Sequence, residues 1–261
     1  MVFELKNYIE SLLNKEKRTD LRKLDEYRQP ITVEYGISAK SADGSAKVTI
    51  GETIVVAGVK FGVDKPYPDN PDEGTIIVNA ELLPLSAPEF EPGPPDIYAI
   101  ELSRVVDRAI RESKAIDFKK LCITAKEKCW ILFIDIYPIN NAGNLFDAAG
   151  LAALAALQDA RFPKYDEAKE TVIYEKSERP IELLKMPISC TILKIGKKMI
   201  VDPTIEEEKA MDARLTVATI DKDTICAMQK GGAISLSIDE VKAMVDIAFS
   251  KREELLKHLK K

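Results

Sequence analysis

The chain has 261 residues, of which 46% are hydrophobic and 31% are charged, as is typical of a folded globular protein. Its formal net charge is −5, which disfavours a general nucleic-acid coat or a membrane-surface binder, since both are usually basic. No apolar run reaches about 18 residues and the N-terminus lacks the basic start of a signal peptide, so we expect a cytoplasmic protein without a membrane span.

The first part of the chain predicts one helix followed by strands. Residues 3–15 form an amphipathic pattern, and such a helix either docks on a neighbouring chain or caps its own domain. A charged stretch follows over residues 18–28. Alternating or β-rich runs, one pair of them joined by a turn at Gly51-Glu52, predict strands at 31–36, 46–50, 53–61 and 75–83.

The next expected helix, over residues 101–114, is basic in an acidic protein. Its apolar positions recur at helical spacing and comprise Ile100, Leu102, Val105, Val106, Ala109 and Ile110. A ridge of cations lies beside them, formed by Arg104, Arg108, Arg111 and Lys114. These cations either form surface ion pairs with Glu101, Asp107 and Glu112, or bind phosphate, for which guanidinium groups are well suited.

The remaining chain predicts two more groups of elements. Residues 121–124 and 129–137 are β-rich, and the second run is apolar on both faces, so we expect it to be covered on both sides. An Ala/Leu-rich core helix opens at Asp147, and a polar connector at 163–169 ends the first domain. After it we expect strands at 171–174, 188–195, 199–201, 214–220 and 224–229, an acidic solvated bend at 202–208 and a long helix at 238–260.

Each half therefore runs several strands and then a helix, which indicates an α+β protein with two α+β domains. We place the first domain at residues 1–170, with the helix 3–15 included, and the second at 171–261. Neither half contains a GxGxxG or GxxxxGK[ST] loop. We detect no convincing residue-level repeat between the halves.

Residues for nucleophilic or metal chemistry are scarce. His258 is the only histidine, which removes Ser-His-Asp triads, Cys-His dyads and histidine-ligated metals within one chain. The cysteines Cys122, Cys129, Cys190 and Cys226 have no metal-ligand spacing, so we expect buried reduced thiols. We therefore predict neither a metal site nor a cofactor.

Several motifs in fixed order resemble one family, the ribonuclease PH fold proteins that build exosome rings. Arg18-Thr19-Asp20-Leu21-Arg22 is similar to its R-x-D-G-R signature, with Leu21 in place of glycine. Further similarity lies at 79–85, at 90–95, in the basic helix, at Asp147-Ala148-Ala149, and over 201–214. Together they cover about residues 18–250 and look most like the catalytically silent ring subunit of the archaeal exosome core.

The resemblance implies two domains, of the ribosomal protein S5 domain 2-like and ribonuclease PH C-terminal types. It also implies pairing with an active ribonuclease PH-like paralogue in a hexameric ring of three heterodimers, with RNA-binding cap subunits on one face. Such a ring degrades single-stranded RNA from 3′ to 5′ by phosphorolysis. Among the cations of this sequence, Arg104 and Arg108 are then the best candidates for RNA phosphates, while Arg111 and Lys114 are weaker ones.

The sequence also departs from active members of that family. They carry two arginines before the basic helix, where this chain has Asp96-Ile97-Tyr98-Ala99. They also carry an aspartate cluster in the second domain, whose nearest counterparts here are Asp202 and Glu208, and a further expected aspartate is Arg214. Because a cation neither donates a proton readily nor ligates a metal, we expect no catalytic residue in this chain.

Three hypotheses follow. The first is a non-catalytic ring subunit that helps a paralogue to hold RNA. The second is an independent phosphate-dependent 3′-to-5′ exoribonuclease, which would need Asp202 and Glu208 as acids. The third is a purely structural subunit whose basic ridge makes protein contacts.

Overall fold

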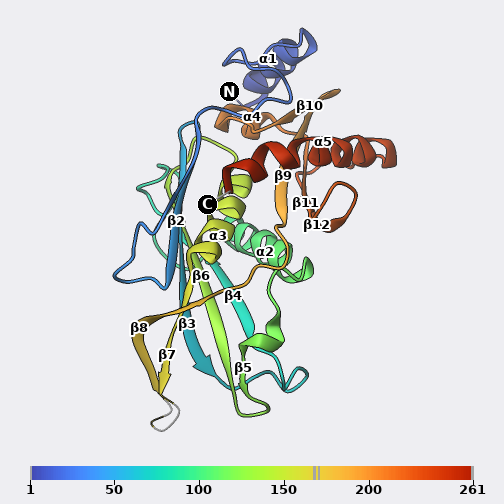
Figure 1. Cartoon of the computed structure of the whole chain (residues 1–261). Coiled ribbons are helices and arrows are strands. Elements are labelled where there is room, and N and C mark those ends of the chain that lie inside the picture. The colour runs from blue at the N-terminus through green and yellow to red at the C-terminus, as the bar shows by residue number, and fades with distance from the viewer. Residues whose placement is uncertain (1, 167–168, 170, 260–261) are drawn as a thin grey trace.

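The first part of the chain folds into one sheet. The computed structural model, drawn in Figure 1, describes residues 2–166, 169 and 171–259. The strands of the first sheet are β1 (Ile31–Tyr35), β2 (Gly44–Ile50), β3 (Thr53–Asp64), β4 (Thr75–Ala80), β5 (Cys122–Thr124) and β6 (Lys128–Asn140). Their order is β1-β2-β3-β6-β4, and β5 pairs with β6. Neighbouring strands are antiparallel except β4, which runs parallel to β6.

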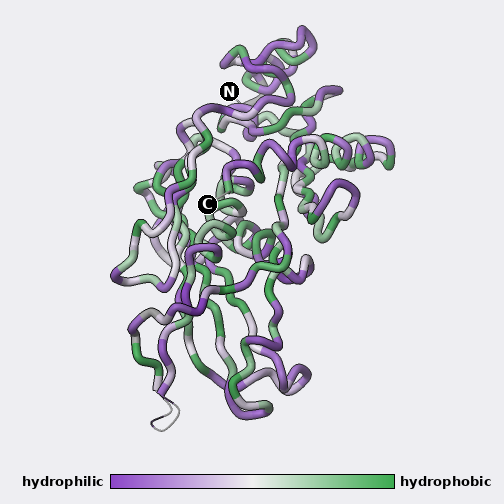
Figure 2. The backbone as a smooth tube through the Cα atoms, in the orientation of Figure 1, coloured by the Kyte–Doolittle hydropathy of each residue, from purple (hydrophilic) through white to green (hydrophobic). Residues whose placement is uncertain are grey.

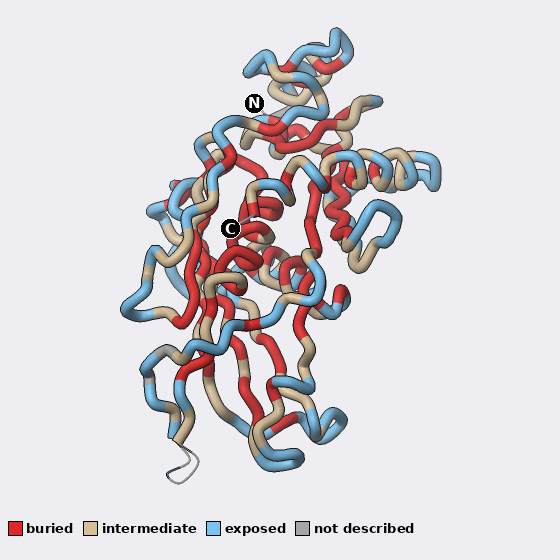
Figure 3. Tube along the Cα trace, viewed as in Figure 1, coloured by how far each residue is buried: buried red, intermediate tan, exposed pale blue. Residues whose placement is uncertain are grey.

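Two helices, α2 (Ile97–Glu112) and α3 (Leu145–Asp159), pack on this sheet (Figure 1). The expected core helix is α3, which is rich in alanine and almost wholly buried. Its closeness to β2 depends on Gly44, because a Cβ there would lie 2.4 Å from the carbonyl oxygen of Ala156. Figure 2 shows hydrophobic residues along the strands and α3, and Figure 3 shows the same region buried.

Strand β6 is buried on one face only, so the expectation that it is covered on both sides is wrong for the single chain. Trp130 and Leu132 are buried, whereas Ile131 and Phe133, which alternate with them, are half-buried. The helices that pack on the sheet lie on the face of Leu132. The apolar residues of the opposite face therefore keep part of their surface accessible.

The second sheet has four strands, β9 (Ile188–Ile195), β10 (Lys198–Val201), β11 (Ala213–Thr219) and β12 (Ile225–Gly231), in the order β10-β9-β11-β12. The long helix α5 (Ile238–Leu256) packs on β9 and β11. It begins at a capping box in which Ser237 and Glu240 exchange hydrogen bonds between side chain and backbone. Residues 257–259 form a separate 3-10 turn, so the α-helix ends before the predicted residue 260.

The expected solvated bend at 202–208 is wrong, because a short helix, α4 (Ile205–Ala210), occupies much of it. Thr204 and Glu207 close a second capping box, which satisfies the backbone donors at its start. Asp202 and Glu207 are buried. Two of the acidic residues of this stretch are therefore part of the packed interior, whereas Glu206 is exposed.

The predicted connector at 163–169 is also wrong, because strand β7 (Arg161–Asp166) overlaps it and pairs with β8 (Thr171–Pro180). Residues 167–168 and 170 lie outside the described residues. Trp130 of the first sheet contacts the rings of Phe162 and Tyr165, so this hairpin packs on the first unit. The predicted division at residue 170 falls within the hairpin, and the second sheet begins at β9.

The N-terminal helix α1 (Val2–Asn14), which we grouped with the first domain, packs on the second unit of its own chain. Ile9 and Leu13 are buried against Leu193, Ile195 and Ile200. Figure 1 shows α1 beside α4 and β10, away from the first sheet. Of the two roles that the sequence left open, the structure therefore supports a cap on the chain itself. None of the described helices combines the length and apolar composition that crossing a bilayer requires.

Candidate nucleic-acid interface

The basic helix α2 starts earlier than the sequence predicted. The Asp96 side chain accepts a hydrogen bond from the Ala99 amide at 2.7 Å and caps the helix after the proline-rich segment. Every predicted apolar position is buried except Ile100, which is 47% exposed. Ile100 lies one turn before Arg104, so it belongs to the outer face of the helix. The prediction that it faces the core is therefore wrong.

The structure separates the four predicted cations. Arg104 and Arg108 are exposed, stand one helical turn apart, and make no hydrogen bond or ion pair with any described residue. Lys114 lies beyond the helix, after the C-cap Ser113, in a left-handed backbone conformation with φ 55°. The predicted single ridge is therefore a pair of free arginines followed by two residues in different settings.

Arg111 is held within the chain. Its guanidinium donates to the Asp107 carboxylate at 2.8 and 3.1 Å and to the Ile76 carbonyl at 2.9 Å. A further hydrogen bond, of 3.3 Å, reaches the Thr75 hydroxyl. The hydrogen bond to Asp107 raises the pKa of Arg111 above its ordinary value. Because its donors are engaged, Arg111 fastens α2 to β4 and is a poor candidate for RNA.

Helix α2 also contacts the second unit. Arg108 lines a crevice between α2 and β12, together with Met228 and Gln229. The Sγ of Cys226 in β12 lies 3.8 Å from the Ala109 carbonyl oxygen. The two free arginines thus stand near the junction of the two sheets, on a helix supported from both sides.

Arg214, which stands where the resemblance leads us to expect an aspartate, is neutralised inside the chain. It is only 6% exposed, and its Nη2 lies 2.5 Å from Oε1 of Glu101 on α2. Its guanidinium carbon lies 4.0 Å from the ring centre of Phe146. A Cβ at Gly231 would lie 2.6 Å from the same guanidinium, so the glycine leaves it room. This cation therefore ties α2 to β11.

Asp202 is a structural carboxylate. It is 0% exposed, and Arg28 donates to it from its amide at 2.6 Å, from Nε at 2.9 Å and from Nη2 at 2.8 Å. Arg22 adds a contact of 3.0 Å, and the Asn144 amide one of 2.9 Å. Because arginine and asparagine donors occupy both of its oxygens, this carboxylate has a structural role and is a poor candidate for a catalytic acid.

Arg18, Arg22 and Arg28 together hold Asp202 and Glu207, and we call this set of contacts the clamp. The motif similar to R-x-D-G-R supplies two of its arginines, Arg18 and Arg22. Arg18 is buried and forms a bidentate pair with Glu207, with contacts of 2.9 and 2.5 Å. It also donates to the Val201 and Asp202 carbonyls, both at 2.9 Å. Leu21 occupies the family's glycine position with φ 65°, a left-handed conformation that glycine adopts without strain.

Glu208 is a titratable group whose setting the sequence did not reveal. Burial raises its pKa to about 7, although the backbone N–H of Asn144 donates a hydrogen bond of 2.8 Å to its carboxylate. It lines a cavity of about 230 Å³ that Tyr98 and Lys209 also line. Asp147 nearby in the chain's core has a pKa raised by burial to about 6 and accepts the Tyr27 hydroxyl at 2.7 Å. The raised pKa values of both carboxyl groups result from contacts between segments that are distant in the sequence, so no local sequence pattern predicts them.

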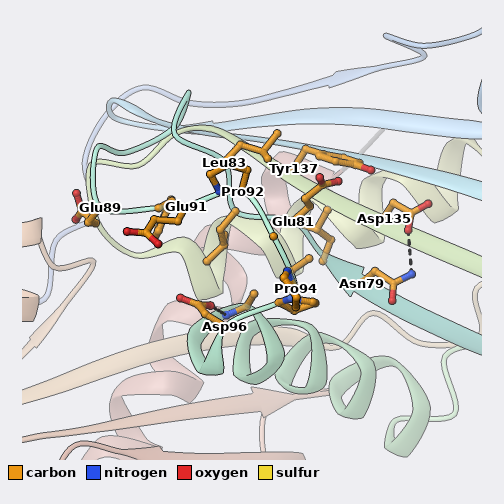
Figure 4. Close-up of a pocket in the computed structure, with 17 residues that line it drawn as sticks. Asn79, Glu81, Leu83, Glu89, Glu91, Pro92, Pro94, Asp96, Asp135 and Tyr137 are labelled. Atoms are coloured by element: carbon orange, nitrogen blue, oxygen red, sulfur yellow. Dashed lines mark hydrogen bonds between the residues drawn. The ribbon is translucent and has the colours of Figure 1, made fainter.

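The surroundings of the α2 N-terminus are acidic. Figure 4 shows a cavity of about 620 Å³ between the proline-rich segment, β4 and β6. Its lining includes five carboxylates, from Glu81, Glu89, Glu91, Asp96 and Asp135, and no lysine or arginine. Coulomb repulsion disfavours phosphate here. Active members of the family that the sequence resembles would carry their arginine pair at this place.

No group of three or more His, Cys, Asp or Glu side chains within the described ranges is arranged to hold a metal ion. The charged residues of the site therefore form three groups. Arg104 and Arg108 are free of partners among the described residues, and Arg214 is paired with Glu101. The carboxylates of Asp202 and Glu208 lie between the two units.

Comparison with known proteins identifies the fold. Residues 27–163 match domain 1 of the 3′ exoribonuclease family, and residues 185–251 match domain 2. The chain is 45% identical to exosome complex component Rrp42 of Methanothermobacter thermautotrophicus, over 97% of this chain and 93% of that protein.

Two solved structures are also similar. One chain of the Archaeoglobus fulgidus exosome with RNA bound to the active site is 42% identical, with a TM-score of 0.89 and 99% of each chain covered. A chain of an archaeal exosome core is 39% identical, with a TM-score of 0.85, covering 100% of this chain and 98% of that one. These matches confirm the predicted ribonuclease PH fold. The chain therefore belongs to the 3′ exoribonuclease family, and its first and second sheets lie within the residues that match domains 1 and 2 of that family.

Proposed function

We propose that this chain is the non-catalytic subunit of an archaeal exosome ring, in which it pairs with an active ribonuclease PH-like paralogue. Three such pairs form the hexameric ring, which degrades RNA from 3′ to 5′ by phosphorolysis and carries RNA-binding cap subunits on one face. The names of its relatives, at about 45% identity over nearly the full chain, support the exosome assignment. We also place the complex in the cytoplasm.

The observation that carries the proposal is the pair Arg104 and Arg108. Two unpaired guanidiniums one turn apart on a helix can each contact a phosphate of the same strand. Arg111 and Glu101 anchor α2 to β4 and β11, so the positions of Arg104 and Arg108 are fixed while their own guanidinium groups stay available for a ligand. Contacts to phosphate serve a strand of any sequence, which a degradative complex requires.

The absence of catalysis in this chain is supported by the charges around the same helix. The groove at the start of α2 is acidic, Arg214 replaces an acid, and Asp202 is saturated by arginine donors. An exoribonuclease that uses phosphate needs cations where this chain has carboxylates. Catalysis is therefore assigned to the paralogue, and this chain supplies Arg104 and Arg108 to the RNA from across the interface.

The test is the double variant Arg104→Glu with Arg108→Glu in the reconstituted ring. We expect at least a tenfold loss of RNA affinity with ring assembly unchanged. Lys242→Glu with Lys257→Glu is the matched control, because it reverses two exposed charges outside α2, one near the start of α5 and one directly after its end. Equal RNA affinity in the arginine variant and this control would refute the role of the arginines.

The two other hypotheses have separate tests. If the chain is an exoribonuclease by itself, the purified chain releases nucleoside diphosphates from RNA and inorganic phosphate. Glu208→Gln is the variant that tests for a catalytic acid, because a change at the structural Asp202 would break its contacts with Arg28 and Asn144. If the chain is purely structural, RNA does not crosslink to α2 even at low salt, whereas the phosphate role predicts crosslinks that form at low salt and are lost at high salt.

A further inference from the structure

Two of the four cysteines lie opposite each other on neighbouring strands. Cys122 opens β5 and Cys129 lies near the start of β6, and their Cα atoms are partners in the antiparallel register. Partners of this kind stand about 4.5–5.5 Å apart and direct their side chains to the same face. A disulfide requires Cα atoms about 4.4–6.8 Å apart. Both thiols are free, and paired strand positions have the spacing that a disulfide requires, although the register shifts between Cys122 and Thr124.

The two thiols differ in access and influence each other. Cys129 is 1% exposed, whereas Cys122 is only half-buried. Burial raises the pKa of Cys129, and the proximity of Cys122 and then Asp64 raises it further. This electrostatic interaction is consistent with the strand register, which pairs the two cysteines. Cys122 is the thiol that a dissolved oxidant meets first.

The other two cysteines have different surroundings. Cys190 is buried and receives a hydrogen bond from the Tyr27 hydroxyl at 3.2 Å. Cys226 donates to the Ala218 carbonyl at 3.4 Å, and burial raises its pKa to about 11. Both belong to the region between the two units, away from the β5–β6 hairpin. They are therefore internal controls for thiol reactivity.

We propose that Cys122 and Cys129 form a site of reversible oxidation, where a low-molecular-weight disulfide such as oxidised glutathione converts them to a cross-strand disulfide. In the first step the Cys122 thiolate attacks oxidised glutathione, which yields a mixed disulfide and one reduced glutathione. In the second step Cys129 loses its proton and attacks the Cys122 sulfur, which forms the protein disulfide and releases a second reduced glutathione. One disulfide is consumed and one is formed, so electrons and protons balance.

The bond would fasten a part of the first unit that several segments share. The Lys126 amide, in the β5–β6 turn, donates to the Pro71 carbonyl at 2.7 Å. The Gly74 amide donates to the Phe118 carbonyl at 2.9 Å, just before β5. A cross-link between β5 and β6 therefore restrains the turn on which the loop at 65–74 rests, and opening of this corner becomes rarer.

The test is mass spectrometry of the folded full-length chain after incubation with oxidised glutathione. We expect the loss of two hydrogens and a peptide pair joined through Cys122 and Cys129, reversed by dithiothreitol. The variant Cys226→Ser should behave like the parent chain, whereas Cys122→Ser should abolish the cross-link. Hydrogen exchange of the β5–β6 turn should slow at least threefold in the oxidised form.

Three results would overturn the proposal. One is a glutathione adduct on Cys122 that never proceeds to the internal disulfide. Another is a cross-link that involves Cys190 or Cys226 instead. The third is a cross-link that forms only under conditions in which circular dichroism shows the chain to be unfolded.

Discussion

The ion pair between Glu101 and Arg214 gives a quantitative test of how α2 is held between the two units. Arg214 is almost completely buried and forms an ion pair with Glu101. Replacing Glu101 by alanine removes the ion-pair partner of that guanidinium. Breaking a fully buried pair costs about 3–5 kcal/mol, and the 25% exposure of the Glu101 side chain reduces this to about 2–3 kcal/mol.

The assay is urea unfolding of the purified chain, which compares the free energy of unfolding of Glu101→Ala with the parent chain. Alanine has the higher helix propensity, so the measured loss understates the effect of the lost pair. Glu182→Ala is the matched control, since Glu182 pairs with Lys120 at 2.6 Å but both side chains are exposed. We expect the control to lose much less, because water screens an exposed ion pair. Equal losses in the two variants would refute the reasoning.

Two further predictions concern the carboxylates between the units. The pKa of Glu208 is raised from 4.5 to about 7, so between these pH values the folded chain binds more protons than the unfolded chain. The contribution of Glu208 to the free energy of unfolding therefore falls as the pH rises from 4.5 to about 7, by up to about 3 kcal/mol. Glu208→Gln keeps an acceptor for the Asn144 amide and should flatten that part of a pH series of urea midpoints; an unchanged pH dependence would contradict the raised pKa. Asp202→Asn removes the counter-charge of Arg22 and Arg28, so we expect a loss of about 3–5 kcal/mol in unfolding free energy, and a loss below about 1 kcal/mol would show that the clamp is not structural.

Features set by local periodicity were predictable from sequence. The buried face of α2 follows from apolar residues at helical spacing, and the hairpin between β2 and β3 follows from the turn at Gly51, which has φ 58°. The core role of α3 follows from its alanines and leucines. The prediction for Ile100 was wrong because the other apolar residues set the buried face of α2, and Ile100 lies outside that face.

Features set by contacts between distant residues were not predictable. Arg28 and Asp202 are 174 positions apart, and Glu101 and Arg214 are 113 apart. A single sequence carries no signal for either pairing. The ion pair of Arg111 with Asp107 was visible as an i, i+4 alternative, but the contact with the Ile76 carbonyl that makes it structural was not.

The same limit explains the misplaced hairpin and the acidic bend. The strand β7 contains Pro163 and polar residues, which locally favour a connector, and only pairing with β8 makes it a strand. The acids at 202–208 look solvated in isolation. Asp202 and Glu207 are nevertheless buried, because Arg28 and Arg18 of the N-terminal segment pair with them.

The central claim is that Arg104 and Arg108 contact RNA phosphates in a site completed by a paralogue. The most direct measurement is the salt dependence of RNA binding by the reconstituted ring with Arg104→Gln and Arg108→Gln. For single strands, each phosphate contact contributes about 0.7 to the slope of log affinity against log salt, so the slope should fall by about 1.4 while the ring stays intact. An unchanged slope, at unchanged affinity, would contradict the account.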